Sequence, residues 1–436
     1  MSAHNGVLVE RINAVARVFL SLLIFWLPYG SAVVEACVII SLLLWIAKRI
    51  ILFDARSFKN LVLKGKISLF LKSFRPAASF LDLPILVFLA ACLISVVLSA
   101  YPLHALRGFT TKTLEWFIVY FLVLEFIATK KHIMTAVGVF LFSAFAVNLD
   151  AIVQFHFTQK DIFLGQTIIK GSGATASFNT YNSLGGYLTF VFPVALSLLF
   201  VSVKRAWKVI FFVIFVSAIW CLIATLSRGA WLSVCLAGAF FLFFINPKAA
   251  LLSLTVLFVS AILFPIFASS QVKETFRIAA SQQGSVAWRF DVWLYSARMI
   301  AQKPIFGYGL NTYMMLFEKC FVNPSGLPLY YPSYAHNCYI QIAFEIGIFG
   351  LGSFLWLMLQ SFQKTLETIK SYMKKTEKNL AMLNLGLISG VAGFLSHSFF
   401  DTNFYSLKLS VLFWYMIGLL ISIDKLLRLQ NIPAIK

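Results

Sequence analysis

Charged side chains are scarce in this chain. Only 12% of its 436 residues are Asp, Glu, Lys or Arg, whereas 60% are hydrophobic. A soluble domain carries about twice this charged fraction, roughly 25%, so this composition cannot provide a surface that faces water on all sides. The apolar side chains must therefore face lipid or one another. The sequence predicts an all-α integral membrane protein, although its length alone would suggest two or three soluble domains.

Motifs of several familiar enzyme classes are also missing. The sequence has no Walker A loop, no HExxH and no dinucleotide-binding fingerprint. Its six cysteines form no CxxC or other metal-ligand spacing, and we expect no metal and no cofactor. Two of the cysteines, Cys320 and Cys338, flank one loop, and the sequence leaves open whether they pair. No apolar run carries the series of charged residues that marks an ion relay.

The hydrophobic runs are long enough to cross a bilayer. A helix of about 20 residues spans the ~30 Å hydrocarbon core, and counting such runs predicts about twelve transmembrane helices. The predicted spans are 13–30, 32–52, 82–99, 113–128, 132–155, 181–203, 207–226, 229–245, 249–267, 337–362, 380–400 and 405–423. The chain is therefore expected to form one polytopic membrane domain, 1–436.

Lysine and arginine predict the orientation of these spans. With a cytoplasmic N-terminus, 24 of the 36 Lys and Arg residues fall in cytoplasmic segments or at the span ends beside them. This bias follows the positive-inside rule and predicts that both termini are cytoplasmic. The net charge of +20 is then a topology signal and an attraction to anionic lipid headgroups, not a nucleic-acid site. The basic connector 53–81 is predicted to be cytoplasmic, with 56–75 forming either a basic surface helix or a solvated linker.

Two segments predicted on the outer side are too long to be simple turns. They are 156–180 and the long extracytoplasmic loop 268–336. Within the longer one, SVAWRFDVWLYSARMIA has apolar residues at helical spacing, namely Phe290, Trp293, Leu294, Ala297 and Ile300. We expect a helix that lies on the outer leaflet or covers the bundle, followed by the turn-rich stretch QKPIFGYGLNTY.

Two arginines near the outer face are candidate anion ligands. Arg228, in TLSRGAWLS, lies between two apolar runs, where a charge is costly unless it reaches the interface or meets an anion. Arg289, in AWRFDVW, lies on the predicted loop helix. A guanidinium binds phosphate oxygens through two parallel hydrogen bonds and stays charged at every working pH. The alternatives are a snorkelling anchor for Arg228 and a solvated loop charge for Arg289.

Polar residues gather where the long loop enters the tenth predicted span, in YPSYAHNCYIQIAFEIGIFG. His336 and Asn337 lie at this boundary, and an imidazole there can accept a proton. The alternative is that His336 is only an interfacial polar residue. Glu345 is half a helical turn out of phase with His336, so we expect it to pack against other helices instead of orienting the imidazole.

A second polar pair follows the eleventh predicted span, in LSHSFFDTNFYS. His397 and Asp401 are spaced i, i+4, so their side chains can hydrogen-bond to each other beside the same outer vestibule. The alternative is a simple polar turn between two helices.

Three strings, in this order, resemble the O-antigen ligase and O-antigen polymerase superfamily of lipid-linked polysaccharide transferases. The first is GATASFNTYNSLGGYLTFVFPVALSLL, which resembles the family's loop before a long apolar helix. The second is LSRGAWLS, at the start of a span. The third runs from WRFDVW through KPIFGYGLNTY to AHNCYIQIAFEIGIFG, like the family's long outer loop and its His-Asn exit.

The resemblance implies a metal-independent transferase that inverts the anomeric carbon of a glycan linked to undecaprenyl diphosphate. It assigns Arg228 and Arg289 to the donor diphosphate and His336 to the acceptor hydroxyl. Asn337 and Asp401 are predicted to contact substrate, although Asp401 matches a family acid only loosely. The expected location is the inner membrane, with the active site facing the periplasm.

Several functions stay open at this point. The leading hypothesis is an O-antigen ligase that moves the glycan to an outer-face acceptor such as lipid A–core. A polymerase of the same superfamily and a protein-glycosylating relative are alternatives. A twelve-span transporter or flippase is a different class, but it predicts polar or broken helices at the bilayer midplane, whereas the distinctive polar residues here lie at the outer face.

Overall fold

The computed structural model describes residues 3–53, 68–70, 72–169, 172–267, 285–320, 334–373 and 377–429. Within these ranges the protein is α-helical, and its β-structure there is limited to one bridge between Lys160 and Thr167. The predicted all-α membrane fold is confirmed. Most of the basic connector 56–75 and large parts of the outer loop 268–336 lie outside the described residues.

Each predicted apolar run forms a helix. These helices are α1 (Ala3–Trp26), α2 (Ser31–Leu52), α5 (Asp82–Val97), α7 (Leu114–Phe126), α8 (Lys130–Val153), α9 (Tyr181–Leu199), α10 (Arg205–Ala224), α11 (Arg228–Ile245), α12 (Pro247–Phe267), α16 (Cys338–Tyr372), α17 (Lys378–His397) and α18 (Leu407–Leu429). Shorter helices outside these runs are α6 (Pro102–Gly108), α14 (Ser285–Gln302) and α15 (Tyr313–Cys320). Among the described residues, eight helices are long and apolar enough to cross a membrane. The count of twelve spans therefore stays a prediction.

The central helices are the most buried. In α18, 89% of the apolar window lies inside the protein, against 22% in α10. Trp414 of α18 packs against Trp116 and Phe117 of α7 with ring centroids 6.4 and 4.6 Å apart. The periphery differs, because α10 exposes large apolar side chains such as Trp207, Val209, Ile210 and Phe212. Exposed apolar helix faces of this kind are suited to contact with lipid.

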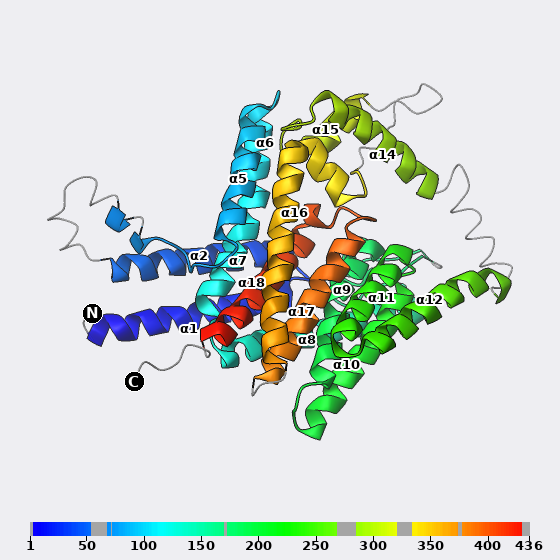
Figure 1. The fold of residues 1–436 in the computed structure, drawn as a ribbon, viewed down its shortest axis with the longest axis horizontal. Coiled ribbons are helices and arrows are strands. Elements are labelled where there is room, and N and C mark those ends of the chain that lie inside the picture. The colour runs from blue at the N-terminus through cyan, green and yellow to red at the C-terminus, as the bar shows by residue number, and fades with distance from the viewer. Residues whose placement is uncertain are drawn as a thin grey trace.

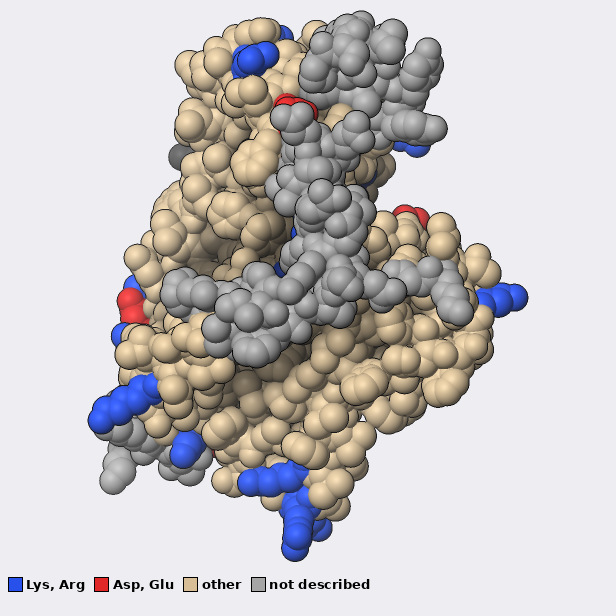
Figure 2. Space-filling model, turned by 90° about the vertical axis from the view of Figure 1, so that its right-hand side faces the viewer, with Lys and Arg blue, Asp and Glu red and all other residues tan. Residues whose placement is uncertain are grey.

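The two sides of the molecule differ in what they carry. In Figure 1 the start of α1 and the end of α18 lie on one side, and α14 and α15 lie on the opposite side. The cytoplasmic location of both termini stays a prediction. In Figure 2 most lysine and arginine side chains lie near the margins of the face shown, and much of its visible lower surface is uncharged. An uncharged surface of this kind is what the hydrocarbon core of a bilayer requires.

Helix α16 is longer than predicted and is interrupted. It continues to Tyr372, beyond the predicted end at 362. The prediction stopped early because the last turns of the helix are amphipathic and do not read as a continuous apolar run. Tyr372 is buried there and donates its hydroxyl to the carbonyl oxygen of Leu427 at 2.5 Å. Near its other end, Gly347 has φ 72° and ψ −176°, a conformation that only glycine adopts readily.

The turn-rich stretch KPIFGYG fills this interruption. Ile348 N–H donates to the carbonyl of Pro304 at 2.8 Å, and Gly309 N–H donates to the carbonyl of Glu345 at 2.9 Å. A Cβ on Gly347 would lie 2.1 Å from the carbonyl oxygen of Ile305, so no larger residue fits. The loop supplies the backbone partners that an unbroken helix would have provided for itself.

The predicted loop helix is confirmed as α14. Val292 and Ser296 are fully buried against a small cluster that includes Tyr313, Phe317 and Phe344. On another face, Phe290 and Leu294 are 61% and 55% exposed. The helix therefore packs on the bundle through one face and presents apolar side chains outward through the other, as a helix at the outer leaflet would.

Candidate functional site

His336 is held in place by its backbone neighbours. Its φ is 48°, in the left-handed region that few non-glycine residues adopt. On one side, Ala335 N–H donates to Oε1 of Gln341 at 3.2 Å. On the other, the side-chain oxygen of Asn337 accepts from the amides of Tyr339 and Ile340 at 2.9 and 3.1 Å and so caps α16. The imidazole is therefore presented at the N-terminal end of α16 by a fixed turn.

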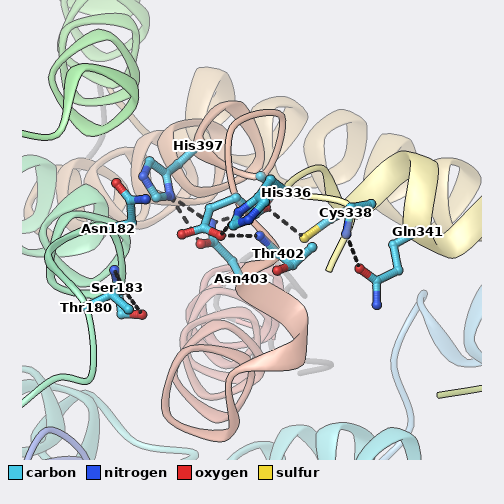
Figure 3. A network of polar contacts seen from close by, with 12 residues as sticks. Thr180, Asn182, Ser183, His336, Cys338, Gln341, His397, Thr402 and Asn403 are labelled. Atoms are coloured by element: carbon cyan, nitrogen blue, oxygen red, sulfur yellow. Dashed lines mark hydrogen bonds and ion pairs between the residues drawn. The ribbon is translucent and has the colours of Figure 1, made fainter. Parts of the chain in front are cut away.

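Asp401 is the acidic partner of His336. Nδ1 of His336 lies 3.4 Å from Oδ1 of Asp401, and their side chains are 33% and 17% exposed. The same oxygen accepts from the Thr402 amide at 2.8 Å. The segment between α17 and α18, which carries Asp401, is also bonded to the start of α16. Cys338 donates its backbone N–H to the carbonyl of Ser398 at 2.8 Å and its thiol to the carbonyl of Asp401 at 3.3 Å. Figure 3 shows this network.

The charge of Asp401 is stabilised by its neighbours. Burial acts to raise the pKa of this carboxyl. The hydrogen bond from His336, the charges of His397 and His336 and the Thr402 amide act the other way, and together they hold the pKa below its usual value. Asp401 is therefore ionised at neutral pH. A carboxylate in this position can orient the imidazole of His336 and stabilise the cationic form that appears when the imidazole accepts a proton.

The predicted side-chain bond between His397 and Asp401 is replaced by other contacts. Nδ1 of His397 lies 3.1 and 3.0 Å from the two amide atoms of Asn403, and Asn403 Nδ2 donates to Oγ of Ser398 at 3.2 Å. His397 reaches Asp401 through the backbone, where Asp401 N–H donates to the His397 carbonyl at 3.1 Å. The two residues do lie beside the same site.

A cavity of about 400 Å³ opens beside His336 and Asp401. Most of the residues that line it are polar, and they come from four parts of the chain: the start of α2, the start of α9 with the preceding loop, the end of the long outer loop, and the segment that joins α17 to α18 together with the first residues of α18. The lining residues are Ser31, Phe178, Asn179, Thr180, Asn182, Ser183, Tyr334, His336, Asp401, Thr402, Asn403, Tyr405, Ser406, Leu407, Lys408 and Leu409. Hydroxyl, amide and phenol groups of this kind suit a polyhydroxylated ligand.

Arg228 begins helix α11 near this cavity without lining it. Ser227 caps the helix by accepting from the Ala230 amide at 3.3 Å, and its Oγ donates to Oδ1 of the cavity residue Asn182 at 2.7 Å. The Gly229 backbone packs against Phe400, beside Asp401, since a Cβ there would lie 2.9 Å from Phe400 Cβ. The side chain of Arg228 is exposed. Its position at the N-terminus of α11 suits an anionic group, because the positive end of the helix dipole adds to its charge.

Arg289 is connected to the site through helix α14. Trp293, one helical turn further on, donates its indole N–H to the carbonyl of Ala335 at 2.8 Å, directly before His336. Residues spaced i, i+4 share a helix face, so Arg289 lies on the face that meets the site. It is also close enough to His397 for its positive charge to act there. Arg289 and Trp293 are both partly buried.

Glu345 has a structural role, as predicted. It is fully buried. Its Oε2 accepts from the amide of Asn311 at 2.8 Å and the hydroxyl of Tyr405 at 2.9 Å, and its Oε1 accepts from Nε2 of Gln341 at 3.4 Å. It contacts the end of the KPIFGYG stretch and the cavity wall, not His336. Cys338 is a buried free cysteine, and the side chain of Cys320 lies outside the described part of the chain.

Several cavity residues were missed by the sequence reasoning. Asn182, Thr402 and Asn403 belong to strings that were noted, but no role was assigned to them. Lys408 had no signal beyond its charge, and its Nζ donates to the carbonyls of Pro28 and Ser177 at 2.6 and 2.8 Å. Clusters of three or more His, Cys, Asp or Glu that could hold a metal are absent from the described part of the chain.

Comparison with known proteins gives this site a family context. The O-antigen ligase family matches residues 213–355, a range that holds Arg228, Arg289, His336 and Asn337 but not Asp401. The predicted resemblance to the O-antigen ligase superfamily is confirmed. The similarity supports a glycan-transferring membrane enzyme.

Individual relatives agree with this assignment. The O-antigen ligase of Salmonella typhimurium strain LT2 is 24% identical over 69% of this chain and 73% of its own length. A provisionally assigned polysaccharide ligase of Rickettsia felis is 28% identical over 49% of this chain and 54% of its own length. Another from Rickettsia conorii is 25% identical over 66% of this chain and 75% of its own length.

Proposed function

We propose that this protein is a membrane ligase that transfers a glycan from undecaprenyl diphosphate to a hydroxyl group of an acceptor on the outer face of the inner membrane. The pairing of His336 with Asp401, 3.4 Å apart beside a polar cavity, is the observation that carries this proposal. The family match and the relatives' names support the transfer of polysaccharide.

The proposed reaction is a direct displacement at the anomeric carbon. The acceptor oxygen attacks this carbon and forms the new glycosidic bond, while the bond from the carbon to the diphosphate oxygen breaks. The acceptor proton passes to the imidazole of His336, and undecaprenyl diphosphate leaves with the electron pair. One displacement inverts the anomeric configuration. The diphosphate already activates the anomeric carbon of the donor as a leaving group, so the scheme requires neither a nucleotide nor a metal.

Two kinds of side chain serve this scheme. His336 is the catalytic base. Asp401 is a positioning residue that orients the imidazole and stabilises its protonated form. A positioned base raises the reaction rate by ~10²–10⁴-fold. Arg228 and Arg289 bind the diphosphate and stabilise the charge that develops on the leaving group. The capping oxygen of Asn337 is already used, which leaves its Nδ2 group to contact a substrate. An acceptor such as lipid A–core would enter the cavity from the periplasm.

A transfer assay tests this proposal directly. Purified wild type and His336→Ala are incubated with lipid-linked donor and a core acceptor, and donor binding and melting temperature are measured in parallel. We expect His336→Ala to lower transfer by ~10²-fold or more, with donor binding and melting temperature near wild type. Transfer within a few-fold of wild type would remove His336 from the mechanism.

A donor-only arm separates the ligase from the polymerase of the same superfamily. A ligase leaves the glycan length unchanged and needs the acceptor to release undecaprenyl diphosphate. A polymerase lengthens the lipid-linked glycan without any acceptor. Elongated glycan in the donor-only reaction would replace the ligase proposal with the polymerase.

A further inference from the structure

A second, chemically different cavity lies between α1 and α8, in a part of the molecule that the proposed reaction does not use. Its volume is about 510 Å³. Most of its wall is apolar, formed by Ala14, Val18, Leu22, Phe25, Ile127, Ala136 and Val139. The polar wall residues are Arg17, Ser21, Lys131, His132 and Thr135. We call this cavity the α1–α8 groove.

The basic residues of the groove gather at one end. Ser143 Oγ donates to the carbonyl of Phe25 at 2.7 Å and so aligns the two helices beyond Val139. Arg17 precedes Phe25 by eight residues, which is about 12 Å of helix, and the α1 residues that line the groove between them are mainly apolar. Arg17 is close enough to His132 for its charge to act there, and Lys131 is the chain neighbour of His132, so these three residues share one end of an apolar channel of about 12 Å.

The basic end retains capacity to bind an anion. Nδ1 of His132 is buried and, among the described residues, has no hydrogen-bond partner. Lys131 is exposed. Arg17 pairs with Glu10 at 3.0 Å, but the Glu10 side chain is 69% exposed, and a solvated pair of this kind contributes at most about 1 kcal/mol. An anion at this level meets three cationic or donor groups and one weakly held carboxylate.

This end of the groove belongs to the side of the molecule where other basic helix ends gather. Lys130 pairs with Glu377 at 3.0 Å, which places the start of α8 beside the start of α17. Lys48 and Arg49 at the end of α2 both bind Glu125 at 2.7 Å. The excess of lysine and arginine predicts that this side is cytoplasmic, where anionic headgroups are enriched at the membrane surface.

A neighbouring groove shares one of the basic residues. Lys131 also borders a cavity of about 390 Å³ on the other side of α8, whose wall includes Met134, Leu141, Leu198, Val203, Trp207 and Phe211. Two apolar channels therefore meet at one lysine. A glycerophospholipid has the same arrangement, with two acyl chains that diverge from one phosphate.

We propose that an anionic glycerophospholipid of the inner leaflet binds here. Its phosphate contacts Arg17, Lys131 and His132, one acyl chain occupies the α1–α8 groove, and the second lies against Trp207 on the other side of α8. The ~12 Å channel fits within one leaflet, which is about half of the ~30 Å hydrocarbon core. Charge selects the headgroup, because a zwitterionic lipid would add a positive group beside Arg17 and Lys131, which repel it.

Lipid retention by the purified full-length protein tests the proposal without reference to catalysis. The protein in detergent is mixed with phosphatidylglycerol or with phosphatidylcholine, and bound lipid is counted by native mass spectrometry. Wild type is expected to retain phosphatidylglycerol at least tenfold better than phosphatidylcholine. Equal retention of the two lipids would overturn the proposal.

Variants separate the basic end from the apolar channel. Arg17→Gln with Lys131→Gln removes two charges, and Lys370→Gln with Lys425→Gln removes two exposed charges at the ends of α16 and α18, neither of which lines the groove. We expect the first pair to lose the preference for phosphatidylglycerol and the second to keep it. Val18→Trp fills the groove from its 56% exposed wall position, and it should reduce retention of both lipids.

A conservative variant guards against misfolding. Arg17→Lys with Lys131→Arg keeps both charges and should retain the wild-type lipid preference, and melting temperatures of all variants are measured in lipid-free detergent. Unchanged phosphatidylglycerol retention in the glutamine pair would overturn the proposal. So would equal losses in the glutamine pair and in its control.

Discussion

The indole N–H of Trp293 donates to the carbonyl oxygen of Ala335 at 2.8 Å. This bond connects α14, which carries Arg289, to the residue before His336. The proposed diphosphate ligand and the proposed base are therefore held by a single short chain of covalent and hydrogen bonds. Phe290 and Leu294 on the same helix remain exposed, so α14 can contact the membrane while it is anchored at the site.

Removing this indole bond should slow transfer without unfolding the protein. Trp293→Phe keeps an aromatic ring but loses the donor, at a cost of about 1 kcal/mol, which is roughly a fivefold change in rate. The control is Trp220→Phe, which loses a comparable indole bond to His156 outside the cavity wall. Equal transfer rates in the two variants would show that α14 is not positioned through Trp293.

The two arginines should not tolerate lysine. Arg228→Lys and Arg289→Lys keep the charge but lose the paired N–H groups that match a diphosphate. We expect transfer to fall by about tenfold or more in each variant, with a higher KM for the lipid-linked donor and unchanged protein levels. Arg298→Lys, at an exposed position on the same helix as Arg289, is the matched control and should behave as wild type. Full activity in both site variants would contradict diphosphate binding.

The charge of Asp401 makes the stability of the folded protein depend on pH. Its pKa is lowered in the folded protein, so its stabilising effect is complete above the unfolded value of about 3.9 and is lost as the pH falls through the lower folded value. Asp401→Asn should therefore melt below wild type at pH 6–7, and the two melting temperatures should converge below about pH 4. A constant difference across this range would exclude a charged Asp401 as the cause.

Replacing Glu345 by glutamine should destabilise the protein. Both of its oxygens face donors, because Oε2 accepts from the Asn311 amide and the Tyr405 hydroxyl and Oε1 accepts from the Gln341 side-chain amide. In Glu345→Gln one oxygen becomes an NH₂ group that faces donors, at a cost of about 1–3 kcal/mol. We expect a lower melting temperature and lower transfer, whereas Glu367→Gln, whose side chain is 58% exposed on the same helix, should change neither. A wild-type melting curve for Glu345→Gln would mean that Glu345 is already protonated and donates one bond.

The predicted topology can be tested at described, exposed positions. In a cysteine-free background, Gln302→Cys on α14 should react with an impermeant maleimide in intact spheroplasts, and Lys370→Cys on α16 should react only after permeabilisation. The reverse pattern would invert the orientation and move the cavity beside His336 to the cytoplasm.

The helices were predictable from sequence because uninterrupted apolar runs have few alternatives in a bilayer. The end of α16 was not, since its last turns are amphipathic and Tyr372 is buried only through contact with α18. The pairing of His336 with Asp401 was also out of reach, because it joins two loops through tertiary packing. Spacing suggested a side-chain bond between His397 and Asp401, but His397 pairs with the Asn403 amide and Asp401 pairs with His336.

The interruption at Gly347 has a consequence for how the protein is made. Pro304–Gly309 leaves the ribosome before α16, so the backbone groups of Glu345 and Ile348 that it binds do not yet exist. This segment must cross to the outer side with its own amide and carbonyl groups still hydrated. It can dock only when α16 arrives, and the outer part of the protein therefore finishes folding after the spans on both sides of it are in the membrane.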